Sequence, residues 1–100
     1  MKNGTEILKA MAQETRLRIL ELLRGGERCV CEIYPAIGEE QSNVSRHLNL
    51  MEKAGILSRR KEGLKIIYGI KYPEVLNILE LAREILQQEL QGRLRLIKRR

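Results

Sequence analysis

The chain has 100 residues, 43% of them apolar, which is enough for one domain (1–100) with a modest core but not for a second domain or a large enclosed active site. Nineteen Lys and Arg residues against thirteen acids give a net charge of +6, which favours a polyanionic partner. No apolar run approaches the roughly 20 residues that span a bilayer, and no signal-peptide core follows the N-terminus, so we expect a cytoplasmic protein without membrane contact.

Three helices are predicted in the first third of the chain. Thr5 is a suitable N-cap for the first of them. The second spans about 15–24, where leucine and isoleucine recur until a pair of glycines ends the pattern. The third spans about 29–37 and ends at Gly38, and Pro35 inside it is expected to bend the helix.

A fourth helix is predicted over about 41–54. Val44, Leu48 and Met51 recur at the spacing of one helical face and form its inward stripe. The opposite face is polar, without acids, and of the kind that a DNA major groove accepts. Its members are Ser42, Asn43, Ser45, Arg46 and Asn49.

Two strands follow, at 57–61 and 65–70, and Glu62 and Gly63 supply the predicted turn between them. The fold class is therefore mainly α with one β-hairpin. The stretch 42–71, which contains the hairpin, has seven bases and two acids. A basic hairpin directly after a helix-turn-helix would form a wing that lies along the phosphate backbone.

The last helix is expected to start at Pro73, a position where the missing N–H costs nothing. It has two apolar stripes, and a 100-residue monomer could hardly bury both, so we interpret the second stripe as a homodimer interface. The acidic segment 74–90 is followed by five bases in 93–100, a tail that is either a disordered end or a source of further phosphate contacts. The stripes are Val75, Leu79, Ala82, Leu86, Leu90 and Ile78, Leu81, Ile85.

Cys29 and Cys31 are the chain's two cysteines, and in a reducing compartment such a pair suggests metal or redox chemistry. In a regular helix they would lie about 200° apart, so binding one ion would require a distorted first turn. An intramolecular disulfide would close a small ring, so we expect oxidation to link chains or to pass through sulfenic acid. Both cysteines could also be small core residues with no ligand.

Three segments of the chain resemble the ArsR (ArsR/SmtB-type) family of winged-helix repressors that respond to metalloids and metals. They are "ETRLRILELLRGGERCVCEI", "QSNVSRHLNLMEKAGIL" and "RRKEGLKIIYGI", in the family's order and spacing. The resemblance implies four helices, a two-stranded wing and a last helix, in a dimer that pairs the first and last helices. It also implies that arsenite or a soft metal at Cys29 and Cys31 releases the DNA, with no obligatory cofactor.

The resemblance also implies a set of site residues and shows two departures. Arsenite-sensing members usually have a third cysteine where this chain has Tyr34, so a third ligand must come from solvent, a small thiol or elsewhere. The family's Asp and His site on the last helix is excluded, because the chain has no Asp and its single His is on the fourth helix. The expected DNA contacts are Gln41, Ser42, Asn43, Ser45 and Arg46 in the groove, His47 at the groove or bracing the helix, and Arg59, Arg60, Lys61 and Lys65 on the phosphates.

Three classes of function are compatible with these patterns. The first is a sequence-specific repressor with a palindromic operator, released by arsenite or a soft metal, or by thiol oxidation, or without a ligand. The second is a winged-helix module that binds an acidic protein. The third, an enzyme with Cys29 as nucleophile, fits worst, because no Asp, acid pair or phosphate loop accompanies the single His, and we expect no enzymatic activity.

Overall fold

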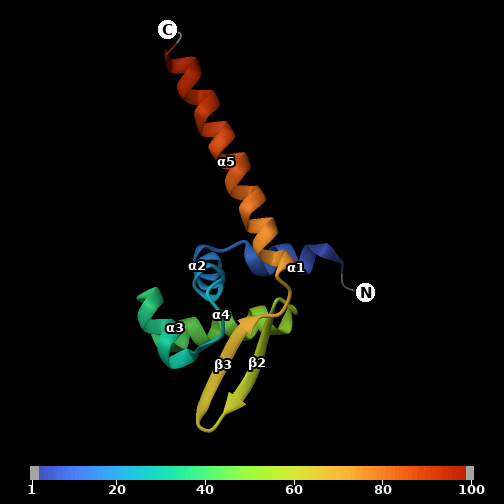
Figure 1. Ribbon diagram of the computed structural model, residues 1–100, viewed down its shortest axis with the longest axis vertical. Helices are drawn as coiled ribbons and strands as arrows, with labels where there is room; N and C mark the ends of the chain where they lie inside the picture. The colour runs from blue at the N-terminus through green and yellow to red at the C-terminus, as the bar shows by residue number, and fades with distance from the viewer. Residues whose placement is uncertain (1–2, 99–100) are drawn as a thin grey trace.

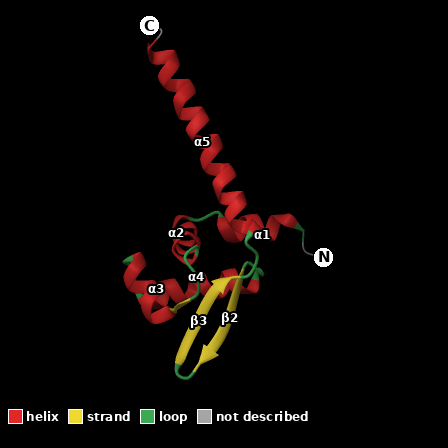
Figure 2. Cartoon of the chain, viewed as in Figure 1, coloured by secondary structure: helices red, strands yellow, loops and turns green. Residues whose placement is uncertain are grey.

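The computed structural model describes residues 3–98, and its elements follow the order expected for a winged helix-turn-helix (Figures 1 and 2). The predicted fold class, mainly α with a β-hairpin before the last helix, is confirmed. The sequence did not predict the short first strand, which adds a third strand to the sheet. The elements are α1 (Gly4–Met11), α2 (Glu14–Leu23), β1 (Arg28–Cys29), α3 (Val30–Ile37), α4 (Gln41–Lys53), β2 (Leu57–Glu62), β3 (Lys65–Ile70) and α5 (Glu74–Lys98).

The helices start close to the expected positions, but their caps differ. The cap of α1 is Asn3 rather than Thr5, because the Asn3 side chain accepts a hydrogen bond from the Thr5 N–H at 2.8 Å. α2 begins one residue earlier than expected, since the Gln13 side chain accepts a bond from the Arg16 N–H at 2.9 Å. α3 ends at Gly38 as predicted, where φ is 80° and favours glycine.

The hydrophobic core lies where α2, α3 and α4 meet the base of the hairpin. The predicted inward stripe of α4 is confirmed, since Val44, Leu48 and Met51 are all completely buried. Because packing holds this side of α4 inward, its polar side must face solvent. The side chains less than 2% exposed are Ile19, Leu20, Ile33, Val44, Leu48, Met51, Ile56 and Leu57.

The sheet is antiparallel with the strand order β1-β3-β2, so β3 is its central strand. Glu62 pairs with Lys65, which leaves Gly63 and Leu64 as the two-residue turn. The predicted turn at Glu62 and Gly63 was therefore wrong by one residue. Gly63 has φ 63°, as tight two-residue hairpin turns require, and Leu64 at the tip is 99% exposed.

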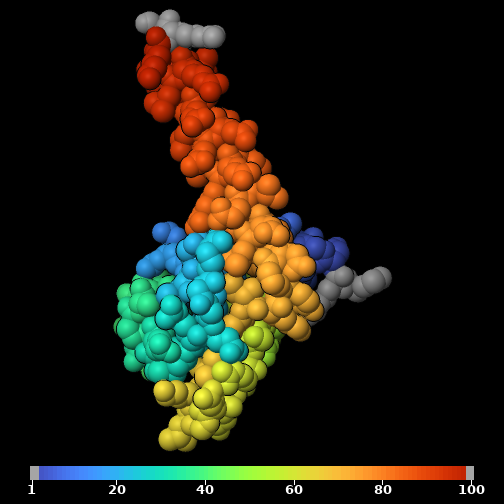
Figure 3. Space-filling view, viewed as in Figure 1, coloured from blue at the N-terminus to red at the C-terminus, as the bar shows by residue number. Residues whose placement is uncertain are grey.

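α5 projects away from the rest of the molecule as a single rod, and its end lies opposite the hairpin (Figures 1 and 3). Within the described residues, α5 is held in its first turns, by burial of Val75 and Leu79 and by ion pairs to α2 and to the C-cap residue of α2. These pairs join Arg24 to Glu80 at 2.7 Å and Arg83 to Glu21 at 3.0 Å. Pro73 immediately precedes the helix rather than opening it.

The basic end of the chain continues α5. Residues 93–98 are helical, whereas 99 and 100 lie outside the described residues. None of the helices in residues 3–98 is long and apolar enough to cross a membrane.

Candidate DNA-binding face and cysteine site

The polar side chains on the outward side of α4 differ in their exposure to solvent. Gln41, Ser42 and Arg46 are exposed, whereas Asn43 and Ser45 are half-buried. The Asn43 side chain accepts a hydrogen bond from Arg46 Nη2 at 2.6 Å. Its amide also donates to Glu39, which lies in the turn between α3 and α4 and accepts a 2.7 Å bond from the Thr15 hydroxyl. Asn43 therefore connects the helix-turn-helix turn to Arg46.

His47 faces inward, toward the preceding helices. Its Nδ1 lies 3.2 Å from Nη1 of Arg16, whose Nε donates to the carbonyl of Ala10 at 2.9 Å. Burial lowers the pKa of His47, and the nearby charges of Arg16 and Arg46 lower it further, although Glu39 opposes them. A neutral ring that accepts from Arg16 ties α4 to α2 and to the end of α1. Of the two expected roles for His47, the geometry supports bracing of α4.

The four predicted basic residues of the hairpin are exposed, but they are not equivalent. Arg59, Lys61 and Lys65 have no ion-pair partner within the part of the chain that the structure describes. Arg60 is bound by two carboxylates, those of Glu27 and Glu62. Three of these bases can therefore meet a phosphate without first breaking an ion pair.

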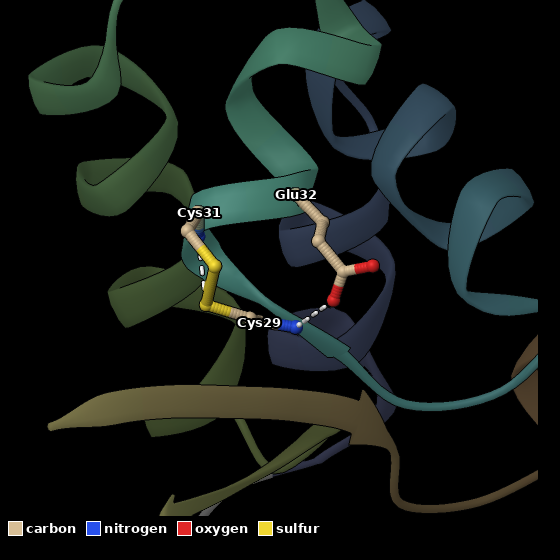
Figure 4. The surroundings of a disulfide bond; sticks show 3 residues. All are labelled: Cys29, Cys31 and Glu32. Carbon is tan, nitrogen blue, oxygen red and sulfur yellow. Dashed lines mark hydrogen bonds between the residues drawn. A yellow bond between two sulfur atoms is a disulfide. The ribbon is translucent and has the colours of Figure 1, made fainter. Parts of the chain in front are cut away.

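Cys29 and Cys31 lie at the junction of β1 and α3, where the chain changes from strand to helix (Figure 4). Cys29 is the N-cap of α3, and its Sγ accepts a hydrogen bond from the Cys31 N–H at 3.0 Å. The Glu32 carboxylate accepts a 3.2 Å bond from the Cys29 N–H, which completes a capping box. Cys29 is 5% exposed, whereas Cys31 is exposed to solvent.

This position overturns two expectations about the cysteines. Cys29 has extended backbone angles, φ −67° and ψ 146°, so it does not lie inside the helix and both sulfurs point to the same side without any distortion of α3. The two residues form an intramolecular disulfide, with their Cα atoms 5.1 Å apart. This separation lies in the usual range for disulfides, so oxidation does not require a second chain.

The cysteine pair lines a groove of about 710 Å³ between the start of α3, the outward side of α4 and the hairpin. Gln41, Ser45, Arg59 and Lys65, four of the predicted DNA contacts, line the same groove. Two further lining residues, Tyr34 and Asn49, were also singled out in the sequence. The sequence did not assign the remaining five to a site, because they come from elements far apart in the chain. These are Val30, Glu52, Leu64, Ile66 and Tyr68.

After reduction of the disulfide, Cys29 and Cys31 would be the only Cys or His ligands among the residues that line this groove. Within residues 3–98, no group of three or more His, Cys, Asp or Glu side chains could hold a metal ion. Tyr34, at the position of the expected third cysteine, is half-buried in the groove lining. The donor set suits a thiophilic ion with two protein bonds, whereas a complete site of three or four ligands from one chain does not fit.

Comparison with known proteins identifies the family. The model of the bacterial regulatory protein, arsR family, matches residues 13–59. Rv0081 of Mycobacterium tuberculosis strain H37Rv, named an uncharacterized HTH-type transcriptional regulator, is 35% identical over 98 residues, which cover 97% of this chain and 86% of Rv0081. Its crystal structure has a TM-score of 0.81 and 36% identity, and covers 91% of this chain and 92% of that one. The chain belongs to the ArsR family.

Two other proteins broaden the comparison within the ArsR family. The arsenical resistance operon repressor of Escherichia coli strain K12 is 41% identical over 66 residues, 65% of this chain and 56% of that repressor. The solution structure of Mb0332 from Mycobacterium bovis, described as a homodimeric winged helix-turn-helix DNA-binding domain, has a TM-score of 0.77 and 31% identity, and covers 88% of this chain and 82% of that one. In this ArsR-family chain, α3 and α4 are thus the helix-turn-helix, and β2 and β3 are the wing.

Proposed function

We propose that this ArsR-family chain is a sequence-specific DNA-binding repressor that is released from its operator by arsenite or a soft metal at Cys29 and Cys31. One observation carries the proposal: the cysteine pair, the outward side of α4 and the wing bases line a single groove. A ligand bound to the pair would therefore act within reach of the DNA-contacting side chains. Such a regulator would act in the cytoplasm, where the DNA is.

In this proposal, α4 supplies base contacts and the wing supplies phosphate contacts. Polar side chains on an exposed helix can hydrogen-bond to base edges in the major groove, while Lys and Arg on the wing provide sequence-independent affinity. We assign base contacts to Gln41, Ser42, Ser45 and Arg46, with Asn43 holding Arg46. We assign phosphate contacts to Arg59, Lys61 and Lys65, and structural roles to His47 and Arg60.

The apolar sides of α1 and α5 support a homodimer. Leu8 is 54% exposed and Ile85 is 67% exposed, far more than leucine and isoleucine side chains in a well-packed monomer. A second copy is the occupant that fits best, because the related Mb0332 domain is described as homodimeric. A two-fold symmetric dimer predicts a palindromic operator with half-sites about one helical turn apart.

Two features favour thiolates at the cysteine pair. After reduction, the N-terminus of α3 and the bases Arg59 and Lys65, which line the same groove, would favour negative sulfur, which is the form that binds soft ions. The E. coli relative is named a repressor of arsenical resistance. Because the chain offers two thiols, the remaining ligand would come from solvent or from a small thiol.

Thiol oxidation is the second candidate signal, and the disulfide between Cys29 and Cys31 favours it. Conversion of the disulfide to two thiols frees Cys29 Sγ, which caps α3, and changes the charge that the groove presents when the thiols ionise. The same two residues would then respond to redox conditions instead of to an ion.

The test is DNA binding by the reduced protein, on an operator selected from random duplexes, with arsenite, cadmium, zinc or a mild oxidant added in turn. We expect one addition to weaken the complex by about 1 to 3 kcal/mol, and the operator to weaken binding of that addition by the same factor. The double variant Cys29→Ser, Cys31→Ser should bind the operator but ignore every addition. If none of the four additions changes DNA binding by the wild-type protein, the proposed sensing function is wrong, whereas the proposed repressor function is unaffected.

The other two classes make different predictions. A winged-helix module for acidic proteins would not retain one specific duplex at physiological salt, so selective operator binding would argue against it. An enzyme with Cys29 as nucleophile needs a base beside the sulfur, but His47 contacts Arg16 instead and Cys29 is almost completely buried. We therefore propose that the chain acts by binding and not by catalysis.

A further inference from the structure

Arg60 differs from the other wing bases because it is already bound within the protein. Its Nη2 lies 3.1 Å from Glu27 Oε1, its Nε donates to Glu27 Oε2 at 3.2 Å, and its Nη1 pairs with Glu62. These hydrogen bonds raise the pKa of Arg60 and lower the pKa of Glu27. Because the N–H groups of Arg60 donate to two carboxylates, a phosphate would have to displace one of them before it could bind the guanidinium.

Glu27 reaches Arg60 by crossing the central strand of the sheet, and Gly69 makes this crossing possible. Glu27 immediately precedes β1, Gly69 lies in β3, and Arg60 lies in β2, in the strand order β1-β3-β2. A Cβ atom at Gly69 would lie 2.8 Å from Cγ of Glu27, closer than real side chains allow. The Glu27 side chain therefore passes over Gly69 to the far strand.

Backbone pairing connects the same three strands two residues further along β1. Cys29 pairs with Ile67 in β3, and Ile67 pairs with Arg60 in β2. Because β1 has only two residues, few hydrogen bonds hold it to the wing. The ion pair between Glu27 and Arg60, which we call the clamp, adds a side-chain link between the two outer strands.

We propose that Glu27 and Arg60 are positioning residues, and that their clamp transmits the state of Cys29 and Cys31 to the wing. The inference rests on the proposed DNA-binding function. Cys29 is both the N-cap of α3 and the last residue of β1, so a change at the cysteine pair would act on both elements. Glu27, two residues before Cys29, moves with that segment, and the clamp carries the movement to β2, where Arg59 and Lys61 flank Arg60.

The first test asks whether Arg60 contacts phosphate, using the salt dependence of non-specific DNA binding. Each phosphate contact contributes about 0.9 to the slope of log K against log salt. We expect Arg59→Ala to lower the slope by about that amount and Arg60→Ala to leave it nearly unchanged. An equal loss of slope in the two variants would overturn the clamp, because Arg60 would then be a phosphate contact.

The second test asks whether the clamp couples the cysteines to the wing. Amide hydrogen exchange of β2 and β3 is measured without DNA, for the disulfide form and for the form reduced with a dithiol. We expect the two forms of the wild-type protein to differ in the wing and the two forms of Glu27→Ala to be alike. Glu62→Ala is the matched control: it also removes a carboxylate from Arg60, but one on the same strand, so the difference should persist.

The third test measures operator affinity in both cysteine states. Glu27→Ala should reduce the ratio of the two affinities from the roughly 5- to 150-fold range of allosteric coupling to about twofold or less, while Glu62→Ala keeps the wild-type ratio. If the wild-type protein had the same operator affinity in both cysteine states, redox control of the repressor would be refuted. The hydrogen-exchange measurement would still test whether the clamp couples the cysteines to the wing. Two results would overturn the inference. One is the same pattern of hydrogen exchange in Glu27→Ala and Glu62→Ala, and the other is hydrogen exchange in the wild-type wing that does not depend on the state of the cysteines.

Discussion

The wing end of the molecule and the free end of α5 are both basic, yet they differ in what surrounds the charge. At the wing end, Arg59, Lys61 and Lys65 lie beside a polar helix face and a groove. On α5, the bases of 93–98 alternate with exposed leucine and isoleucine, and Leu94 is 56% exposed. The two ends lie on opposite sides of the molecule (Figure 1).

This difference shows that positive charge alone does not identify a DNA-binding face. A duplex bound by α4 and the wing lies at the opposite end from the basic end of α5, so the structure does not support further phosphate contacts there. Covering an apolar surface with another apolar surface lowers the free energy. A polar face with unpaired bases instead favours binding of a polyanion. We therefore assign α5 to the second copy of the chain and the wing end to DNA.

The largest effect is expected from placing charge on the apolar side of α5. Leu86 and Leu90 belong to the first apolar stripe, of which the monomer buries only Val75 and Leu79. They are 58% and 49% exposed, so a second copy would cover them together with the second stripe. Leu86→Glu with Leu90→Glu should weaken the dimer by about 3 kcal/mol or more, because two carboxylates would lose water at the interface and two leucines would lose their burial. Sedimentation equilibrium measures the loss.

The control for the α5 variant is Gln87→Glu with Gln91→Glu, which adds the same two charges at exposed residues of the same part of α5 that lie outside both apolar stripes. It should leave the dimer close to wild type. If the Leu86→Glu, Leu90→Glu protein dissociates at the same concentration as the wild-type dimer, α5 is not the interface. The assignment of α5 to a second copy of the chain would then be wrong.

The next effect concerns base recognition at the wing end. Arg46 is exposed on α4 and is oriented by Asn43, so it can reach a base edge. Arg46→Ala should weaken binding to the selected operator by about 1 to 3 kcal/mol and leave binding to random duplex much less affected. Competition titrations with the two duplexes measure the difference. Equal losses on both duplexes would count against base contact by Arg46.

Local sequence patterns predicted the parts of this fold that depend on local physics. The buried stripe of Val44, Leu48 and Met51 follows from helical spacing, and the stop of α3 follows from Gly38. The short strand β1 could not be predicted in this way. Two residues show no alternation, and their extended backbone depends on pairing with β3, which lies about forty positions later.

The errors about the candidate site have the same origin. Without β1, Cys29 seemed to lie inside a helix, so the two sulfurs were expected on different sides. Arg59, Arg60 and Lys61 look alike in a sequence, and only the fold brings Glu27 across Gly69 to Arg60. Composition indicated a polyanionic partner, but which bases are free to meet it depends on contacts between distant residues.

A smaller effect separates phosphate contact from base contact. Lys61→Ala should weaken specific and random duplexes alike, because phosphates are the same in every sequence. It should also lower the salt slope by about 0.9, the contribution of one released counterion. Filter-binding titrations at several salt concentrations give both quantities. A loss confined to the operator would place Lys61 among the base-reading residues instead.

The smallest effect is expected at His47, which contacts Arg16 on the inward side of α4, behind the face that we assign to DNA. Burial and the charges of Arg16 and Arg46 lower its pKa in the folded protein, so the unfolded chain binds the proton more readily. The stability that depends on the neutral ring is therefore present above the ordinary histidine pKa, about 6.5, and is lost as the pH falls below it. Solvent screens the half-buried ring, which keeps the effect small.

Urea unfolding at pH 7.5 and 5.5 isolates this contribution. The carboxyl groups of Glu21 and Glu27, whose pKa values are lowered by Arg24 and Arg60 respectively, stay ionised across this range and do not interfere. We expect the wild-type protein to lose stability between the two pH values and His47→Gln to lose less, because glutamine can accept from Arg16 but cannot titrate. Identical losses in the two proteins would mean that the His47 ring is as free to take up a proton as in the unfolded chain, and that it does not brace α4 through Arg16.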